Sequence, residues 1–135
     1  PADPRLAYEW ACAIDATGDR GRAVAMYHRA LDSGLREPHR HRAQLQAAAA
    51  YRDLGHPDIS LGLIDTVAST HPGSAVVAVL RGLALLDSGQ AAEAVAELVD
   101  ALVDHASDED TAAYRPALHQ AAAHVRAAAQ QPPPH

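Results

Sequence analysis

The sequence predicts an all-α fold of three antiparallel helical hairpins followed by a single C-terminal helix. Turn glycines recur at regular intervals, because Gly18 and Gly55 are 37 residues apart and Gly55 and Gly89 are 34 apart. No segment alternates apolar and polar residues in the manner of a half-buried strand. The apolar content of 48% contains no Phe and consists mainly of Ala, Leu and Val, of which Ala and Leu are strong helix formers.

The first hairpin is expected over residues 4–34. Asp3 has the character of an N-cap and Pro4 that of a first helical residue. Gly18 should end the first helix, and Asp19 should cap the second. Apolar positions with helical spacing are Leu6, Trp10 and Ile14 in the first helix and Ala23, Met26, Tyr27, Ala30 and Leu31 in the second.

The second hairpin is expected over residues 38–71, after a polar connection. Its first helix should run from about Pro38 to Leu54, and its second from Pro57 to about Ser69. Gly55 supplies the left-handed residue that closes one helix, and Pro57 is suited to the first turn of the next. The apolar positions are Leu45, Ala48 and Tyr51, then Leu61, Ile64 and Val67.

The third hairpin is expected over residues 74–106. Ser74 should cap a helix over Ala75–Asp87, which is apolar on nearly every side and is interrupted only by Arg81. Gly89 leads into a helix from Ala91 to about Val103. The second of these helices carries Val95, Leu98 and Leu102 on one side.

The last helix is expected over residues 108–131, with Ser107 or Asp108 as its cap. Pro116 should kink or restart this helix. Residues 1–131 are therefore expected to form one helical repeat domain, and residues 132–135 a Pro-rich tail. The apolar face of the last helix comprises Leu118, Ala121, Ala122, Val125 and Ala129.

Small and large residues recur at fixed distances from the turn glycines. The small ones are Ala11, Ala48 and Gly82 seven residues before, and Ala23, Ser60 and Ala94 five residues after. The large ones are Ile14, Tyr51 and Leu85 four residues before, and Tyr27, Ile64 and Leu98 nine residues after. This pattern resembles the tetratricopeptide repeat (TPR) family. The resemblance implies a bacterial three-repeat domain, a short right-handed α-solenoid closed by a capping helix; an unrelated helical bundle is the alternative.

The resemblance also implies a protein-binding function without catalysis. In the family, the first helices of successive hairpins line a groove that holds a peptide or a partner helix. The best-known mode grips a terminal carboxylate with Lys and Asn, and this chain contains neither residue. Arg42 and Arg52 are nevertheless suited to pairing with an acidic group. By position, the candidate groove residues are Arg5, Tyr8, Cys12 and Asp15; Arg42, Leu45, Ala49, Arg52 and Asp53; and Val76, Val79, Leu83 and Leu86.

Composition limits the partners and the setting. A net charge of −6 argues against nucleic acid as the main partner. No run of about 18 apolar residues is present, so no membrane span is expected. Cys12 is the only cysteine, which precludes an intrachain disulfide and suits a reducing cytoplasm.

Histidine and cysteine chemistry supports a second hypothesis, a small metal- or thiol-dependent enzyme. The chain has nine His residues, but neither His39 with His41 nor His119 with His124 has the four-residue spacing of a helical metal pair. A site pooled from His28, His56 and His71 stays open, as does a nucleophilic Cys12 paired with a histidine. No catalytic, cofactor or metal residue is assigned from the sequence.

The apolar excess of the helix at residues 75–87 needs a cover, because a large bare apolar patch is unusual in a monomer. Three covers are open: the last helix folding back, an apolar segment of a partner protein, or a second copy of the chain. The third would make the chain a homo-oligomerisation module, which is a further alternative function.

Overall fold

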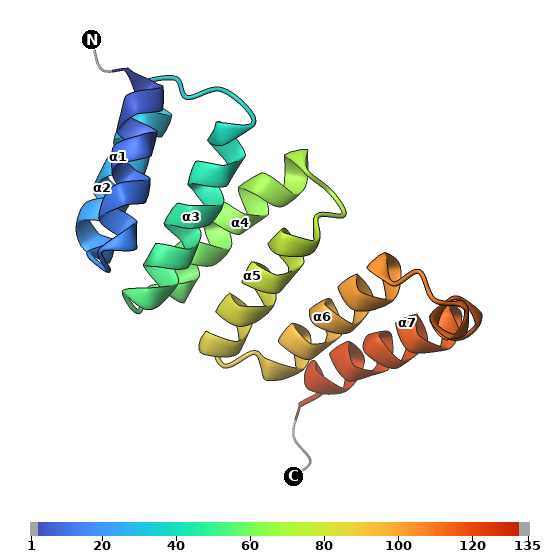
Figure 1. Cartoon of the computed structure of the whole chain (residues 1–135). Helices are drawn as coiled ribbons and strands as arrows, with labels where there is room; N and C mark the ends of the chain where they lie inside the picture. The colour runs from blue at the N-terminus through green and yellow to red at the C-terminus, as the bar shows by residue number, and fades with distance from the viewer. Residues whose placement is uncertain (1–2, 133–135) are drawn as a thin grey trace. The chain divides into compact units, whose positions relative to one another are not determined.

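The computed structural model describes residues 3–132 and contains, within that range, seven α-helices and no strand (Figure 1). The all-α prediction is confirmed; residues 133–135 of the expected Pro-rich tail lie outside the described residues. Among the helices described, none has both the length and the apolar character that crossing a bilayer requires. The helices are α1 (Pro4–Ala16), α2 (Arg20–Asp32), α3 (His39–Asp53), α4 (Pro57–Thr70), α5 (Ala75–Asp87), α6 (Ala91–His105) and α7 (Glu109–Ala129).

Side-chain caps start four of the helices where the sequence predicts them. The Asp3 carboxylate accepts a hydrogen bond from the backbone N–H of Arg5 at 3.0 Å. Asp19 and Ser74 cap α2 and α5 in the same way. Asp108 accepts from the N–H of Thr111 at 2.9 Å, which identifies Asp108 rather than Ser107 as the cap of α7.

The three turn glycines have the left-handed backbone that their role requires. Gly18, Gly55 and Gly89 have φ angles of 90°, 85° and 79°. A residue with a β-carbon is strained in this region, whereas glycine is not. The predicted turns are therefore confirmed, and each separates the two helices of one hairpin.

The chain divides into two compact units, the first ending at Pro72 and the second beginning at Gly73. In the first unit α1 pairs with α2 and α3 with α4, while α3 also contacts α2 and α1 (Figure 1). Ala11, Ala23 and Ala48 are fully buried, as predicted for small residues at helix crossings. The core cluster of this unit contains Ala7, Tyr8, Ala11, Ala23, Tyr27, Ala30, Leu35, Ala43 and Ala47.

In the second unit α5 packs against α6, and α6 against α7 (Figure 1). The predicted small and large positions meet at the α5–α6 crossing, where a β-carbon added to Gly82 would lie 3.0 Å from Cγ of Leu98. Ala94 is buried on the same hairpin, as predicted. The other buried apolar residues of this unit are Val77, Ala84, Leu85, Ala96, Val103 and Ala122.

Two predicted apolar stripes face the core only in part: Ile14 of the first packs against it, and Leu98 of the second contacts Gly82. Leu6 and Trp10 are exposed on α1, and Val95 and Leu102 are exposed on α6. Helical spacing identifies residues that share a face, but it does not say which face is buried. Here the alanine-rich faces are buried, because small side chains let the helix backbones approach closely.

The packing of α7 also bears on the cover of α5, for which three alternatives were open. In the second unit α7 packs against α6, so the alternative in which the last helix folds back over α5 is not the one observed. Its predicted apolar face is largely exposed, with Leu118 and Val125 accessible and Ala122 buried. The helix runs without a break through Pro116, and Figure 1 shows its first turns bent away from the direction of the rest, as a proline within a helix favours.

Candidate functional site

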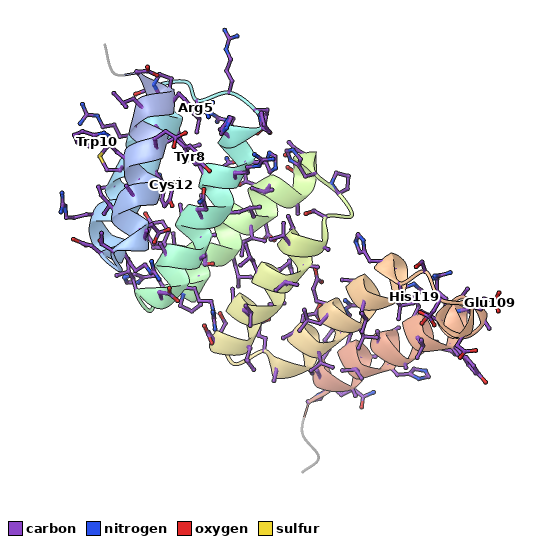
Figure 2. The ribbon with its side chains drawn as sticks, in the orientation of Figure 1. Arg5, Tyr8, Trp10, Cys12, Glu109 and His119 are labelled. Atoms are coloured by element: carbon purple, nitrogen blue, oxygen red, sulfur yellow. The ribbon has the colours of Figure 1, made fainter. Side chains whose placement is uncertain are left out.

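In the first unit, a chain of polar contacts joins the inner faces of α1 and α3. The hydroxyl of Tyr8 donates to Oε1 of Gln46 at 2.8 Å, and Nε2 of Gln46 donates to Sγ of Cys12 at 3.7 Å. Tyr8 and Cys12 lie on the side of α1 that faces α3 (Figure 2). Burial raises the pKa of Tyr8 to about 12, so its hydroxyl stays protonated as a donor. Gln46 was not among the residues predicted from the sequence; with Gln44 it is one of two amide side chains in this alanine-rich helix.

The two acidic residues predicted for the groove both pair with Arg20, which was not predicted as a site residue. Arg20 forms an ion pair with Asp15, and its Nε lies 3.0 Å from Oδ2 of Asp53. The hydroxyl of Tyr27 also donates to Asp15 at 2.8 Å. Because these contacts connect the first hairpin with the second, Asp15 and Asp53 contribute to the structure of the first unit.

The accessible part of the α1–α3 face is polar and carries guanidinium groups. Arg5 is exposed and paired with Glu9 at 3.1 Å, and Arg42 is exposed. Two of the predicted residues, Tyr8 and Leu45, are buried rather than exposed. Cys12, Ala49 and Arg52 are half-buried.

In the second unit, the predicted groove residues form an accessible apolar stripe on α5. The exposed fractions are 52% for Val76, 45% for Val79 and 52% for Leu86, while Leu83 is half-buried. Steps of three or four residues place all four on one face of the helix. We call Val76, Val79, Leu83 and Leu86 the α5 stripe.

The contact between α6 and α7 includes a network of ion pairs. The Arg126 guanidinium lies 3.0 Å from Glu93 and 2.7 Å from Asp100. The imidazole of His119, labelled in Figure 2, lies between Asp100 at 2.7 Å and Asp104 at 2.8 Å. The hydrogen bond to Asp100 is the main reason that the pKa of His119 is raised. Opposite charges facing each other therefore hold α7 by its polar side.

Comparison with known proteins decides the family. The family model described as "Tetratrico peptide repeat" matches residues 4–124. The chain belongs to the tetratricopeptide repeat family. TPR proteins are generally protein-interaction scaffolds.

A solved structure supports the TPR fold. It is described as "MamA 41-end from Desulfovibrio magneticus RS-1" and aligns with a TM-score of 0.64 at 22% identity. The alignment covers 94% of this chain and 73% of that one. At this identity the likeness shows the fold alone. No curated protein matches the chain.

The structure does not pair Cys12 with a histidine, and it groups other residues than the three histidines considered for a metal site. Cys12 accepts its hydrogen bond from the Gln46 amide rather than from a histidine, and His28 lies 2.8 Å from the hydroxyl of Tyr51. Over residues 3–132, the potential metal ligands that come together are Glu37, His41 and His71, without His28 or His56. The overlooked signal is the four-residue spacing of Glu37 and His41.

Proposed function

We propose that this TPR domain is a non-enzymatic scaffold that binds an amphipathic helix of a partner protein along the α5 stripe. The observation that carries the proposal is the exposure of Val76, Val79 and Leu86, each about half accessible on one face. Removing apolar surface from water is favourable by about 25 cal/mol per Å², from which the entropic costs of association are then subtracted. A contiguous exposed apolar patch is typical of an interaction surface.

A helical partner suits the spacing of the stripe. Residues 76, 79, 83 and 86 form a straight apolar ridge along α5, and the apolar face of an amphipathic helix repeats at the same intervals. Helix recognition by apolar grooves commonly uses such a set of anchors. Because the chain carries a net charge of −6, basic residues beside the apolar face of the partner would favour association.

The first unit supplies a different kind of contact. Arg42 is exposed on the α1–α3 face, and guanidinium groups pair well with carboxylates. We therefore propose, independently of the α5 stripe, that this face binds an acidic group. The setting that we propose is the bacterial cytoplasm, which is consistent with a single cysteine and an Arg-only basic composition.

The test selects helical peptides from a displayed library on the wild-type chain and measures their affinity for variants. Val79→Asp combined with Leu86→Asp should weaken binding at least about tenfold, because two charges would be buried in the contact. Leu102→Asp is the matched control, since Leu102 is 72% exposed on α6. Equal affinity for the double variant and the wild type would reject the α5 stripe as the binding surface.

The same variants distinguish a partner helix from a second copy of the chain. If the α5 stripe binds a partner helix and not a second copy of the chain, sedimentation should give the mass of a monomer for the wild-type chain. A wild-type dimer that becomes a monomer in the Val79→Asp, Leu86→Asp variant would instead identify the second copy as the occupant. Circular dichroism of the variant confirms that its helices are intact.

A further inference from the structure

Three metal-binding side chains meet at one end of the second hairpin. Glu37 precedes α3, His41 lies in its first turns, and His71 directly follows α4. Their potential ligand atoms all lie within 4.8 Å of one another. The two imidazole rings face each other with centroids 4.0 Å apart and planes tilted by 31°. None of these residues belongs to the α5 stripe or to the α1–α3 face.

Thr70 fixes which nitrogen of His71 is available. The hydroxyl of Thr70 lies 3.2 Å from the carbonyl of Val67 and 2.9 Å from Nδ1 of His71. Since a carbonyl can only accept, the hydroxyl donates its proton to Val67 and accepts from Nδ1–H of His71. The neutral imidazole then carries its lone pair on Nε2, which is the nitrogen that faces Glu37.

The gap between His71 and Glu37 matches a shared ion better than a hydrogen bond. Nε2 of His71 lies 3.4 Å from Oε2 of Glu37, longer than the usual value of about 2.9 Å for an N–H···O bond. Two ligand atoms bound to a tetrahedral zinc ion at about 2.0–2.1 Å are separated by roughly 3.3 Å. Two electron-pair donors at this distance favour a cation between them.

The remaining contacts orient the carboxylate of Glu37 and place His41 beside it as the third potential zinc ligand. The backbone N–H of His41 donates to Oε1 of Glu37 at 2.7 Å, and Nδ1–H of His41 donates to the same oxygen at 2.9 Å, which leaves the lone pair of the neutral imidazole on Nε2. Oε1 is therefore held in place while Oε2 is directed to His71. Two imidazole nitrogens and one carboxylate oxygen form a donor set that zinc accepts, whereas magnesium and calcium prefer oxygen ligands alone.

We propose that Glu37, His41 and His71 form a zinc-binding site that joins the start of α3 to the end of α4. Thr70 is a positioning residue that holds His71 in the tautomer with a free Nε2. The fourth coordination position is occupied by water or by a group from a bound partner. Because the ion links segments that are distant in sequence, its binding stabilises the second hairpin.

The experiment titrates zinc chloride into the untagged, chelator-treated chain by calorimetry, with magnesium chloride as the second probe. One equivalent of zinc should bind and raise the melting temperature, and magnesium should do neither. His41→Ala, His71→Ala and Glu37→Gln should each weaken zinc binding at least 100-fold, with helicity retained by circular dichroism. Thr70→Val should weaken binding about tenfold through loss of the bond to His71.

His56→Ala and His124→Ala are the matched controls, since both residues are exposed and lie outside the cluster. Each should bind one equivalent of zinc with unchanged affinity. The proposal is overturned if the wild-type chain shows no saturable site for one zinc ion. It is also overturned if the folded His71→Ala or Glu37→Gln variant keeps wild-type affinity, or if a control loses as much affinity as these variants.

Discussion

Tyr27 combines packing and polar contact in one side chain. It is fully buried in the core of the first unit, and its hydroxyl donates to Asp15 at 2.8 Å. Burial and this hydrogen bond raise its pKa, so the hydroxyl stays protonated. Asp15 in turn pairs with Arg20, which reaches Asp53 on α3. The Tyr27 hydroxyl thus supports the link between the first two hairpins.

We expect Tyr27→Phe to lower the free energy of unfolding by about 1–3 kcal/mol, because a half-buried carboxylate loses one hydrogen-bond donor. Tyr114→Phe is the control, since Tyr114 is exposed on α7 and should tolerate the change. Urea denaturation followed by circular dichroism measures both. Equal stability of the two variants would show that the Tyr27 hydroxyl contributes nothing.

The close approach of helices at Ala48 gives a second prediction. Ala48 is fully buried, so Ala48→Leu should destabilise the chain by roughly 1–3 kcal/mol through overpacking. Ala25→Leu, at an exposed position of α2, adds the same atoms without a clash. A melting temperature of Ala48→Leu equal to that of Ala25→Leu would remove Ala48 from the core.

At the scale of elements, the α6–α7 contact should depend on pH. The raised pKa of His119 means that its contribution to stability is complete below its ordinary value of 6.5 and is lost as the pH rises through the folded-state pKa. Burial opposes ionisation of Asp100, but hydrogen bonds from His119 and Arg126 lower its pKa below 3.8. The contribution of Asp100 is therefore present above pH 3.8 and is lost as the pH falls through the lowered pKa.

We expect the melting temperature of the wild-type chain to fall more than that of His119→Gln between about pH 6 and about pH 9, since only the wild-type chain loses the charged imidazole. All other residues are the same in the two proteins, so their contributions cancel in the comparison. Arg126 keeps its pairing with Glu93 and Asp100 throughout, so α7 should stay attached. Identical pH profiles of the two proteins would show that His119 does not stabilise the contact.

Local sequence signals predicted the elements well but not their buried faces. Gly18 and Gly55 end helices because only their backbones adopt positive φ there without strain, a property that one residue carries. The burial of a stripe depends on which helix packs against it. Thus α7 presents His119 and Arg126 to the acidic face of α6, while Leu118 stays accessible. Periodicity alone does not contain that information.

At the scale of the whole molecule, the two units have cores of different composition. The large fully buried side chains Tyr27, Ile64 and Val67 all belong to the first unit. The largest buried side chains of the second unit, Leu85 at 3% and Val103 at 4% exposure, are slightly less enclosed, and ion pairs join α6 to α7. In helical repeat proteins, stability is approximately a sum of repeat and neighbour contributions. We therefore infer that the first unit is the more stable.

Hydrogen exchange measured by mass spectrometry tests this difference. Amides of α2 and α3 should exchange more slowly than those of α5 and α6, because local opening costs more where more apolar surface is buried. The magnesium- and zinc-free chain should be used, so that a bound ion does not add to the protection. Equal protection, or slower exchange in the second unit, would contradict the inference.

Contacts between distant residues mark the limit of what the sequence could predict about the candidate sites. The α5 stripe was predicted because its residues lie on one helix at regular spacing. The Glu37–His41–His71 cluster was missed, since His71 joins it only when the second hairpin folds back on itself. Gln46 and Arg20 were missed for the same reason, because their partners lie on other helices.

The most direct test of the proposed scaffold function is an NMR spectrum of the chain with labelled valine and leucine methyl groups, recorded as a selected helical peptide is added. The methyl signals of Val76, Val79 and Leu86 should shift and saturate together, because these side chains would become buried against the peptide. Those of Val95 and Leu102 on α6 should stay in place. Saturable binding that shifts the α6 signals and leaves the α5 stripe unchanged would contradict the proposed function.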